Sequence, residues 1–429
     1  MKDMSISFVT TILIQIVNIL TGLLAARLLL PEGRGELAEI MLWPGLLIEF
    51  GILAMSDALL YRAATRAASP RTLFATVMWI GAALAIVMTV LAYLIIPHMI
   101  SGDSQVVRDA TGWYIVLYIP VYLFALFVAT MFQGHLDIVA WNVVRALVGL
   151  GYLGFIVGFY VAGSSSVETF AIAYIAGTFV SAIVGLVWLM RKGWVGWKPD
   201  LQVARALVFY GARVHVGEMV NSLRQRVDQM AVSLWLTSSD MGLYVVALTV
   251  ANGPMILVNT VAGVAFPKIS QAPTAEEKLR IFGMYLRLAM ALSIASAAGL
   301  AVLAEYLVPL IFGRLFENSA TICQIMLLGL PFFAAKLMFI QALNAFDRSL
   351  AIGWAEAAGL IAAALSLYGL LPVFGIYGAA WALVVANVVA LAAMAASLNR
   401  QIGARVLPLF RPTAEDFAQV RRLAARVRR

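Results

Sequence analysis

Long apolar stretches alternate with short polar connections along the whole chain. A helix needs about 20 mainly apolar residues to cross the hydrocarbon core of a bilayer, and about twelve stretches of this kind are present. We place them at 7–29, 37–60, 72–97, 112–132, 141–162, 168–190, 209–236, 241–265, 283–303, 319–343, 350–372 and 375–398. The pattern predicts an all-α polytopic membrane protein, with connections too short for a catalytic domain.

Composition supports a lipid environment. The chain has 429 residues, of which 63% are hydrophobic and 12% charged, whereas a soluble domain has about 25% charged residues. A single cysteine, Cys323, and three dispersed histidines exclude a disulfide and give no metal-ligand spacing. We therefore expect no metal, no cofactor and no catalytic residue. The chain is predicted to be a membrane protein and not an enzyme.

Basic residues gather in the even-numbered connections and at the C-terminal end. The odd-numbered connections hold little more than Arg34, Arg108 and Arg314. Because cytoplasmic loops carry the excess of lysine and arginine, both termini are predicted to be cytoplasmic. The net charge of +8 follows from this distribution and does not indicate a nucleic-acid partner. The first apolar stretch is interpreted as an uncleaved span.

A weak internal repeat is visible. Gly35 aligns with Gly242 at an offset of 207, and Ala140 aligns with Ala351 or Ile352 at an offset of 211–212. An even number of spans in each half gives a parallel repeat. We predict an N-terminal six-helix lobe (1–198), a C-terminal six-helix lobe (199–398) and a basic cytoplasmic tail (399–429).

The seventh span is unusually polar. Charge at the centre of a membrane costs roughly 2.5–3.5 kcal/mol on insertion scales, so a polar helix face usually borders protein or water. A cavity-lining helix fits best. The alternative is a cytoplasmic helix end with snorkelling arginines. The polar residues are Arg213, His215, Glu218, Asn221, Arg224, Gln225, Arg226, Asp228 and Gln229.

Other charges in the spans are sparser. Glu49 and Asp57 lie eight positions apart in the second span, so they are predicted to share a face. Together with Glu218 they are the candidates for carrying a coupling proton or sodium ion. Arg145 and Glu356 fall near equivalent positions of the repeat. An ion pair between the lobes and a functional role both fit these two residues.

Several short motifs, in their order along the chain, resemble the oligosaccharide flippases of the multidrug/oligosaccharidyl-lipid/polysaccharide exporter superfamily. In the first motif Leu30 stands where the family has glycine, and Arg34 stands where it has an aromatic residue. The motifs are ARLLLPEGRG at 26–35, VDQ at 227–229, MGLYVVA at 241–247, FPKIS at 266–270, FGRLF at 312–316 and YGAAW at 377–381.

The resemblance implies a V-shaped, MATE-like exporter fold of two six-helix lobes, with helices one, two, seven and eight around a central cavity. It implies a transporter in the bacterial inner membrane. Its substrate would be a polyprenyl-diphosphate-linked glycan, moved to the periplasmic leaflet by alternating access for O-antigen, capsule or exopolysaccharide synthesis. Membrane lipids would surround the lipid tail. A glycan polymerase or glycosyltransferases are candidate partners.

The resemblance also directs attention to the arginines of the seventh span, because a diphosphate is anionic and prefers arginine forks. Asp228 is expected to hold an arginine in place or to bind sugar hydroxyls. The predicted substrate-binding residues are Arg224, Arg226, Arg213, Arg27, Asp228 and Asn221.

Three alternative functions fit the sequence less well. A cation-coupled drug or metabolite exporter of the same fold favours acidic cavity walls, whereas the seventh span has more arginine than acid. A glycan polymerase or ligase needs long periplasmic loops, and these are short. A major-facilitator carrier is expected to have a basic G-x-x-x-D-R-x-G-type second loop, which residues 61–66 do not match. The lipid-linked glycan flippase is therefore the main prediction.

Overall fold

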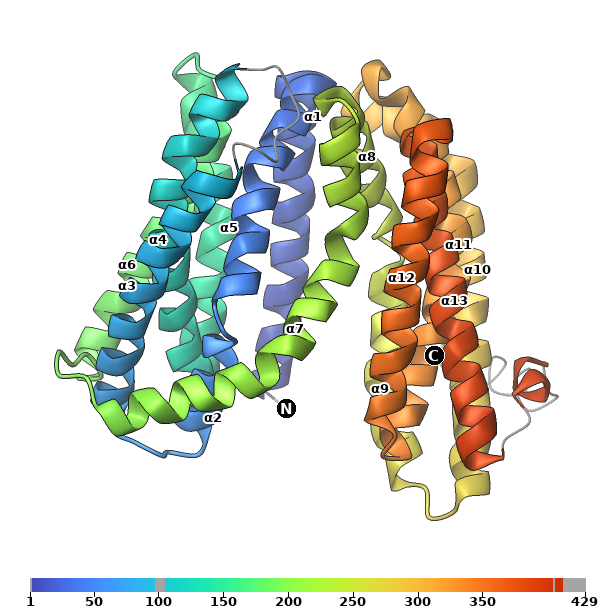
Figure 1. Ribbon diagram of the computed structural model, residues 1–429. Coiled ribbons are helices and arrows are strands. Elements are labelled where there is room, and N and C mark those ends of the chain that lie inside the picture. Colours follow the sequence, from blue (N-terminus) through green and yellow to red (C-terminus); the bar gives the residue numbers. More distant parts are fainter. Residues whose placement is uncertain (1, 97–104, 404–405, 412–429) are drawn as a thin grey trace. The chain divides into compact units, whose positions relative to one another are not determined.

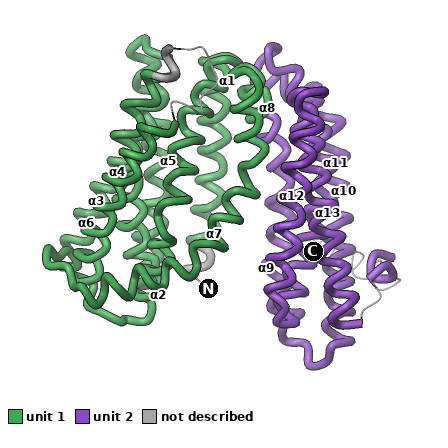
Figure 2. Tube along the Cα trace, in the orientation of Figure 1, with its two compact units in different colours: residues 1–245 green, residues 246–429 purple. Residues whose placement is uncertain are grey.

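The computed structural model describes residues 2–96, 105–403 and 406–411, and helices form most of this part of the chain (Figure 1). No strand occurs in these ranges. The chain divides into two compact units, Met1–Val245 and Val246–Arg429 (Figure 2). The lobe boundary expected at residue 198 stays a prediction. Most of the predicted tail lies outside the described residues.

Unit 1 contains seven helices and the beginning of an eighth. They are α1 (Lys2–Gly51), α2 (Met55–Ala64), α3 (Pro70–Ile95), α4 (Gln105–Gly134), α5 (Ile138–Val161), α6 (Val167–Arg191), α7 (Leu201–Trp235) and α8 (Ser238–Ala251). Unit 2 continues with α9 (Met255–Gln271), α10 (Ala275–Phe312), α11 (Glu317–Ala345), α12 (Ser349–Phe374) and α13 (Ile376–Ile402), and with the short 3₁₀ helices η2 (Arg314–Phe316) and η3 (Leu407–Phe410).

Many of the described helices match the predicted spans. Nine are long and apolar enough to cross a membrane, and a tenth crossing results if α8 and α9, bent by 48°, form one span. Helix α1 contains two arms that run in opposite directions (Figure 1). Helix α7 has 35 residues but is far more polar than these spans. The prediction of an all-helical, multi-pass membrane protein is confirmed.

Short polar side chains mark where several helices begin. Ser69, Asp137, Ser166, Asp200 and Thr274 precede α3, α5, α6, α7 and α10. Each of these side chains accepts a hydrogen bond from the backbone N–H three residues later. Such caps satisfy N–H groups that have no partner within the helix. The turns therefore end one span and start the next within a few residues.

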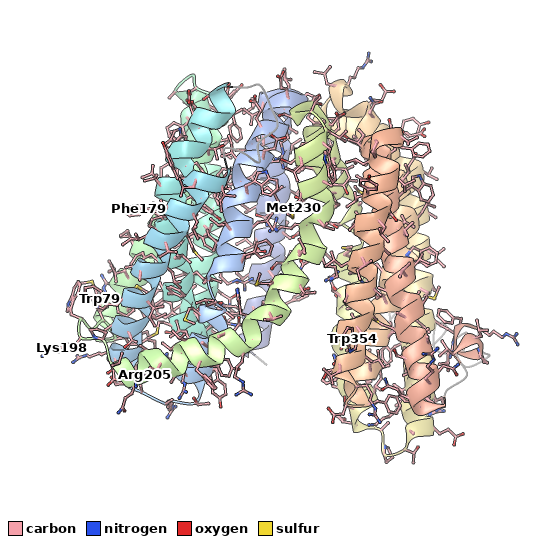
Figure 3. All side chains as sticks on the ribbon, in the orientation of Figure 1. Trp79, Phe179, Lys198, Arg205, Met230 and Trp354 are labelled. Atoms are coloured by element: carbon pink, nitrogen blue, oxygen red, sulfur yellow. The ribbon has the colours of Figure 1, made fainter. Side chains whose placement is uncertain are left out.

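The outer side chains of both units are those expected next to lipid. Trp79 and Phe179 are 62% and 49% exposed in unit 1, and Trp354 is 78% exposed in unit 2 (Figure 3). Lys198 and Arg205 lie at the end of unit 1 where the α6–α7 connection is found (Figure 3). Apolar sides with charge at one end are typical of helix bundles in a bilayer.

The two arms of α1 meet at Leu30. This residue has φ 62° and ψ 179°, a conformation that is essentially restricted to glycine and that costs other residues about 1–3 kcal/mol. The glycine expected here from the family pattern therefore has a conformational reason. Leu30 keeps the sharp turn, and Pro31 begins the second arm.

Helix α8 packs against this turn through two glycines. A Cβ atom on Gly35 would overlap the carbonyl oxygen of Ser238, and a Cβ atom on Gly242 would overlap that of Pro31. Ser238 and Gly242 follow Pro31 and Gly35 by the same 207 positions. The contact is therefore reciprocal, as in an interface with twofold symmetry. This is the arrangement that an internal repeat with that offset would produce.

Two hydrogen bonds extend this packing along the second arm of α1 and between α7 and α8. Trp43 Nε1 donates to Ser233 Oγ at 3.1 Å. The Tyr244 hydroxyl donates to Asp228 Oδ2 at 2.6 Å. We refer to the contact surface made by Gly35, Trp43, Asp228, Ser233, Ser238, Gly242 and Tyr244 as the seam.

Candidate functional site

A polar cavity of about 300 Å³ lies inside unit 1. Five helices supply its walls: the second arm of α1, then α4, α6, α7 and the beginning of α8. The lining residues are Arg34, Ala38, Met41, Leu42, Gly45, Glu49, Tyr118, Tyr122, Tyr174, Arg226, Gln229 and Val245. The cavity combines two cations, one carboxylate and three aromatic rings.

An ion pair joins two walls of this cavity. Nη2 of Arg226 lies 3.7 Å from Oε1 of Glu49, and the two side chains are 41% and 36% exposed. The separation is long for a charge-assisted hydrogen bond, which is typically about 2.7–2.9 Å. Both residues were singled out in the sequence, Arg226 for binding substrate and Glu49 for carrying an ion. The structure places them in contact.

Arg34 adds a second cation to the same cavity. Its Nε atom is buried and has no hydrogen-bond partner among the described residues. With Arg226 and Glu49, it leaves the lining with one more positive charge than negative. Sequence reasoning counted Arg34 as a residue of a connection between spans. In the structure α1 continues through Arg34 to Gly51. The Arg34 side chain lines the cavity of unit 1.

Three tyrosines line the cavity beside these charges. The rings of Tyr118 and Tyr122, on α4, have centroids 5.3 Å apart. The ring of Tyr174, on α6, is centred 5.9 Å from that of Tyr118. Sequence reasoning missed this group. Its signal was the four-residue spacing of Tyr114, Tyr118 and Tyr122, which places them on one face of a helix.

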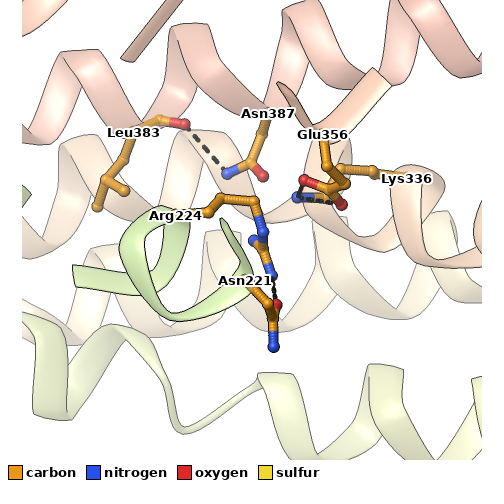
Figure 4. Close-up of polar contacts among 6 residues, drawn as sticks. All are labelled: Asn221, Arg224, Lys336, Glu356, Leu383 and Asn387. Atoms are coloured by element: carbon orange, nitrogen blue, oxygen red, sulfur yellow. Dashed lines mark hydrogen bonds and ion pairs between the residues drawn. The ribbon is translucent and has the colours of Figure 1, made fainter. Parts of the chain in front are cut away.

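Other predicted residues of α7 lie outside the cavity lining. Arg224 Nη2 donates to Asn221 Oδ1 at 3.0 Å (Figure 4). Arg224 and Arg226 are two positions apart, and residues at that spacing do not share a helix face. Arg213 is exposed and lies over the Phe209 ring, 5.7 Å from its centre. The assignment of Arg213, Asn221 and Arg224 to substrate binding stays a prediction.

The predicted carboxylates have different surroundings. Asp228 is 2% exposed and belongs to the seam, where its partner is Tyr244. Glu218 is exposed on α7. The expectation that Glu49 and Asp57 share one helix face is wrong, because α1 ends at Gly51 and α2 begins at Met55. Glu49 and Asp57 therefore lie on different helices, and a spacing of eight residues does not place them on one face. Arg27 is exposed near the end of the first arm of α1.

Arg145 and Glu356 each have a partner within their own unit. The Arg145 guanidinium lies 4.4 Å from the centre of the Trp141 ring. In unit 2, Glu356 Oε1 lies 3.4 Å from Lys336 Nζ, and these side chains are only 14% and 4% exposed (Figure 4). The expected pairing of Arg145 with Glu356 stays a prediction. Within the described ranges, no group of three or more potential ligands could hold a metal ion.

The family model described as polysaccharide biosynthesis protein matches residues 24–321, more than half of the chain. A probable low-salt glycan biosynthesis flippase, Agl15 of Haloferax volcanii, is 26% identical over 247 residues, which are 56% of this chain and 50% of that protein. The matched region thus spans about half the length of this curated relative. The predicted resemblance to polysaccharide flippases is confirmed.

Solved structures show the same fold. The lipid II flippase MurJ in an inward closed conformation has a TM-score of 0.78 at 15% identity, covering 94% of this chain and 89% of MurJ. An inward-facing multidrug resistance MATE family transporter has a TM-score of 0.71 at 13% identity, covering 94% and 96% of the two chains. The predicted MATE-like exporter fold is confirmed. These two neighbours are named as a flippase and as a transporter.

Proposed function

Because the chain belongs to the polysaccharide biosynthesis protein family, we propose that it moves a polyprenyl-diphosphate-linked oligosaccharide from the cytoplasmic to the periplasmic leaflet of the bacterial inner membrane. The glycan would serve O-antigen, capsule or exopolysaccharide synthesis. Transport would proceed by alternating access, with both termini in the cytoplasm. The family match and a glycan flippase among the relatives support glycan transport as the function.

The observation that carries the proposal is the charge of the unit 1 cavity. Arg34 and Arg226 outnumber Glu49 there, and Arg34 Nε has no hydrogen-bond partner among the described residues. An unpartnered donor of this kind attracts an anionic ligand, because burial without a hydrogen bond is costly. Phosphate oxygens match the planar fork of a guanidinium.

Glu49 occupies the place that a phosphate would take. A partly exposed ion pair contributes only about 0–1 kcal/mol, so a diphosphate with more negative charge can replace the carboxylate beside Arg226. The released Glu49 then has no cationic partner in the cavity other than Arg34. Glu49 at that moment would be available to carry the coupling ion, for which a proton and sodium are the two candidates.

A cation-coupled exporter of the same fold is the competing function. It would require the cavity to attract cations, and the excess of arginine in the lining disfavours this. Competition assays can separate the two functions. A lipid-linked glycan should protect the cavity from an anionic probe, whereas a lipophilic drug cation should not.

The test uses the full-length protein in proteoliposomes with a fluorescent polyprenyl-diphosphate oligosaccharide. Leaflet exchange is followed by quenching from the outside. Arg226→Ala should lower the rate at least about tenfold, since one bidentate charge-assisted contact is worth roughly 1.5–3 kcal/mol, and the Arg224→Ala, Arg226→Ala double variant should abolish surface glycan in cells. Arg205→Ala is the matched control on α7, outside the cavity lining.

Native protein that exchanges no lipid-linked glycan under any ion gradient would contradict the proposed function. Arg226→Ala with the native rate would contradict the assignment of this cavity to the substrate.

A further inference from the structure

The tyrosines of the cavity are not explained by phosphate binding. A phosphate needs hydrogen-bond donors and positive charge, which the arginines provide. Tyr118, Tyr122 and Tyr174 instead present aromatic rings beside those charges. Their centroids are 5.3 Å and 5.9 Å apart around Tyr118, and the ring planes are tilted by 43° and 42°. The rings thus form a curved wall.

Two further tyrosines hold this wall from behind. Tyr114 stacks on Tyr118 with centroids 4.8 Å apart and planes 21° apart. Tyr152 meets Tyr174 edge to face at 5.3 Å and 85°. Tyr114 is fully buried. Offset-stacked and edge-to-face pairs are the favoured geometries of aromatic rings, so the wall is preorganised before a ligand arrives.

A sugar ring has the chemistry that this wall recognises. A pyranose has an apolar face of C–H groups, which stacks on an aromatic ring, and a rim of hydroxyls, which bind carboxylates and amides. The cavity supplies rings from the tyrosines and rim acceptors from Glu49 and Gln229. A purely hydrocarbon ligand would leave these polar groups unsatisfied.

The size of the cavity limits how much of a glycan enters it. A volume of about 300 Å³ is at the lower end of the range of about 300–1,000 Å³ for small-molecule sites. It suits one or two sugar rings and not a whole oligosaccharide. Because the arginines and the rings share this one cavity, a sugar on the tyrosines must lie next to a phosphate on the arginines.

We propose that Tyr118, Tyr122 and Tyr174 form a stacking site for the first sugar attached to the diphosphate, while Arg34 and Arg226 bind the adjoining phosphate. This inference rests on the proposed function and adds to it a selective position within the glycan. The protein would then distinguish substrates by their first sugar and tolerate variation further along the chain. Tyr122, which is half-buried and adjacent to Tyr118, is the ring to test.

The experiment measures binding to the purified full-length protein in nanodiscs by calorimetry. The probes are inorganic phosphate, glucose 1-phosphate and galactose 1-phosphate. In the native protein at least one sugar phosphate should bind about tenfold more tightly than phosphate, the affinity ratio expected from aromatic contacts of this kind. Arg226→Ala should weaken the binding of every probe and leave that ratio unchanged.

The tyrosine variants separate stacking from charge. Tyr122→Ala should bring the affinity ratio close to one while phosphate binding persists, and Tyr122→Phe should retain the ratio. Tyr160→Ala, at a 57% exposed position on α5, is the matched control and should match the native protein. Tyr122→Leu repeats the test with a side chain that keeps more apolar volume, and retained phosphate binding shows that each variant is folded.

A native ratio of one, or an unchanged ratio in Tyr122→Ala and Tyr122→Leu, would overturn the stacking site. These results are distinguishable from failure of the proposed function. Native protein that exchanges lipid-linked glycan but has a ratio of one contradicts only the stacking site. Native protein that shows the ratio but exchanges no lipid-linked glycan contradicts the proposed function.

Discussion

The second arm of α1 has two contrasting surroundings. Toward α7 and α8 it forms the seam, where Trp43 is 4% exposed and Gly35 lies directly against the Ser238 backbone. Toward the cavity it presents Glu49, which is 36% exposed and 3.7 Å from Arg226. One side is held by backbone contact and buried hydrogen bonds. The other is held by a loose pair of long side chains.

This difference separates folding from transport on one helix. The seam has no room for an added Cβ atom at Gly35 or Gly242, and the hydrogen bonds made by Trp43 and Tyr244 are buried. The cavity pair is open enough for a ligand to exchange with one of its members. Substitutions in the seam should therefore change stability, and substitutions in the cavity should change ligand binding at nearly constant stability.

The largest effect is expected from Gly35→Ala. The added Cβ would overlap the Ser238 carbonyl oxygen, and only backbone movement could relieve the clash. Overpacking typically costs about 1–3 kcal/mol, and rigid backbone on both sides places this case at about 3 kcal/mol or more. Thermal unfolding of the detergent-solubilised protein measures it. Gly22→Ala, whose Cβ would meet nothing within 4 Å, is the control. Equal melting temperatures for the two variants would show that the backbone at the seam can move to accommodate the added Cβ atom.

Tyr244→Phe should have the next largest effect. It removes the 2.6 Å hydrogen bond to Asp228 and leaves a buried carboxylate oxygen without that donor. An unsatisfied buried polar group costs about 1–3 kcal/mol. The melting temperature should fall, while the affinity for phosphate should stay within about twofold, a change of less than 0.5 kcal/mol. A variant with native stability but weakened phosphate binding would place Asp228 in the site and not in the seam.

The sequence predicted the spans well because lipid leaves the backbone few choices. Every N–H and C=O group in the bilayer core needs an internal partner, so long apolar stretches become helices. The break inside α1 is less readable. Leucine favours helix, and only Pro31 hints that Leu30 adopts φ 62°. The glycine that the family has at this position is a stronger indication of the break. The conformational reason for that glycine is visible only in the dihedral angles of Leu30.

The site was predictable in part. Polar residues within spans marked Glu49, Arg226 and Asp228 as exceptional, but the sequence could not tell which neighbour each would meet. Asp228 faces the Tyr244 hydroxyl and Glu49 faces Arg226. Arg34 was assigned to a connection because the end of a helix is hard to locate near a proline. The tyrosines were missed since an aromatic stripe on a membrane helix usually packs against other helices.

A smaller change of opposite sign is expected from Leu30→Gly at the beginning of the arm. Glycine relieves a strain of about 1–3 kcal/mol, although its greater freedom in the unfolded chain costs about 0.5–1 kcal/mol. The Leu30 side chain is 52% exposed, so little packing is lost. The free energy of unfolding should rise by about 1 kcal/mol, measured as a higher melting temperature. A lower melting temperature would mean that the leucine side chain stabilises the turn more than its backbone strain destabilises it.

The smallest change in stability should come from Glu49→Gln, together with a clear change in binding. Removing a partly exposed ion pair costs about 0–1 kcal/mol, so the melting temperature should remain close to the native value. Phosphate should bind more tightly, by up to about fivefold, because the carboxylate no longer competes for Arg226. The gain should shrink at high ionic strength, where exposed charges are screened. Calorimetry with inorganic phosphate at two salt concentrations measures both effects.

The control is Glu168→Gln, which removes an exposed carboxylate at the start of α6. Unchanged or weaker phosphate binding in Glu49→Gln would mean that Glu49 does not compete with an anion for Arg226. The two sides of the arm would then differ in packing alone.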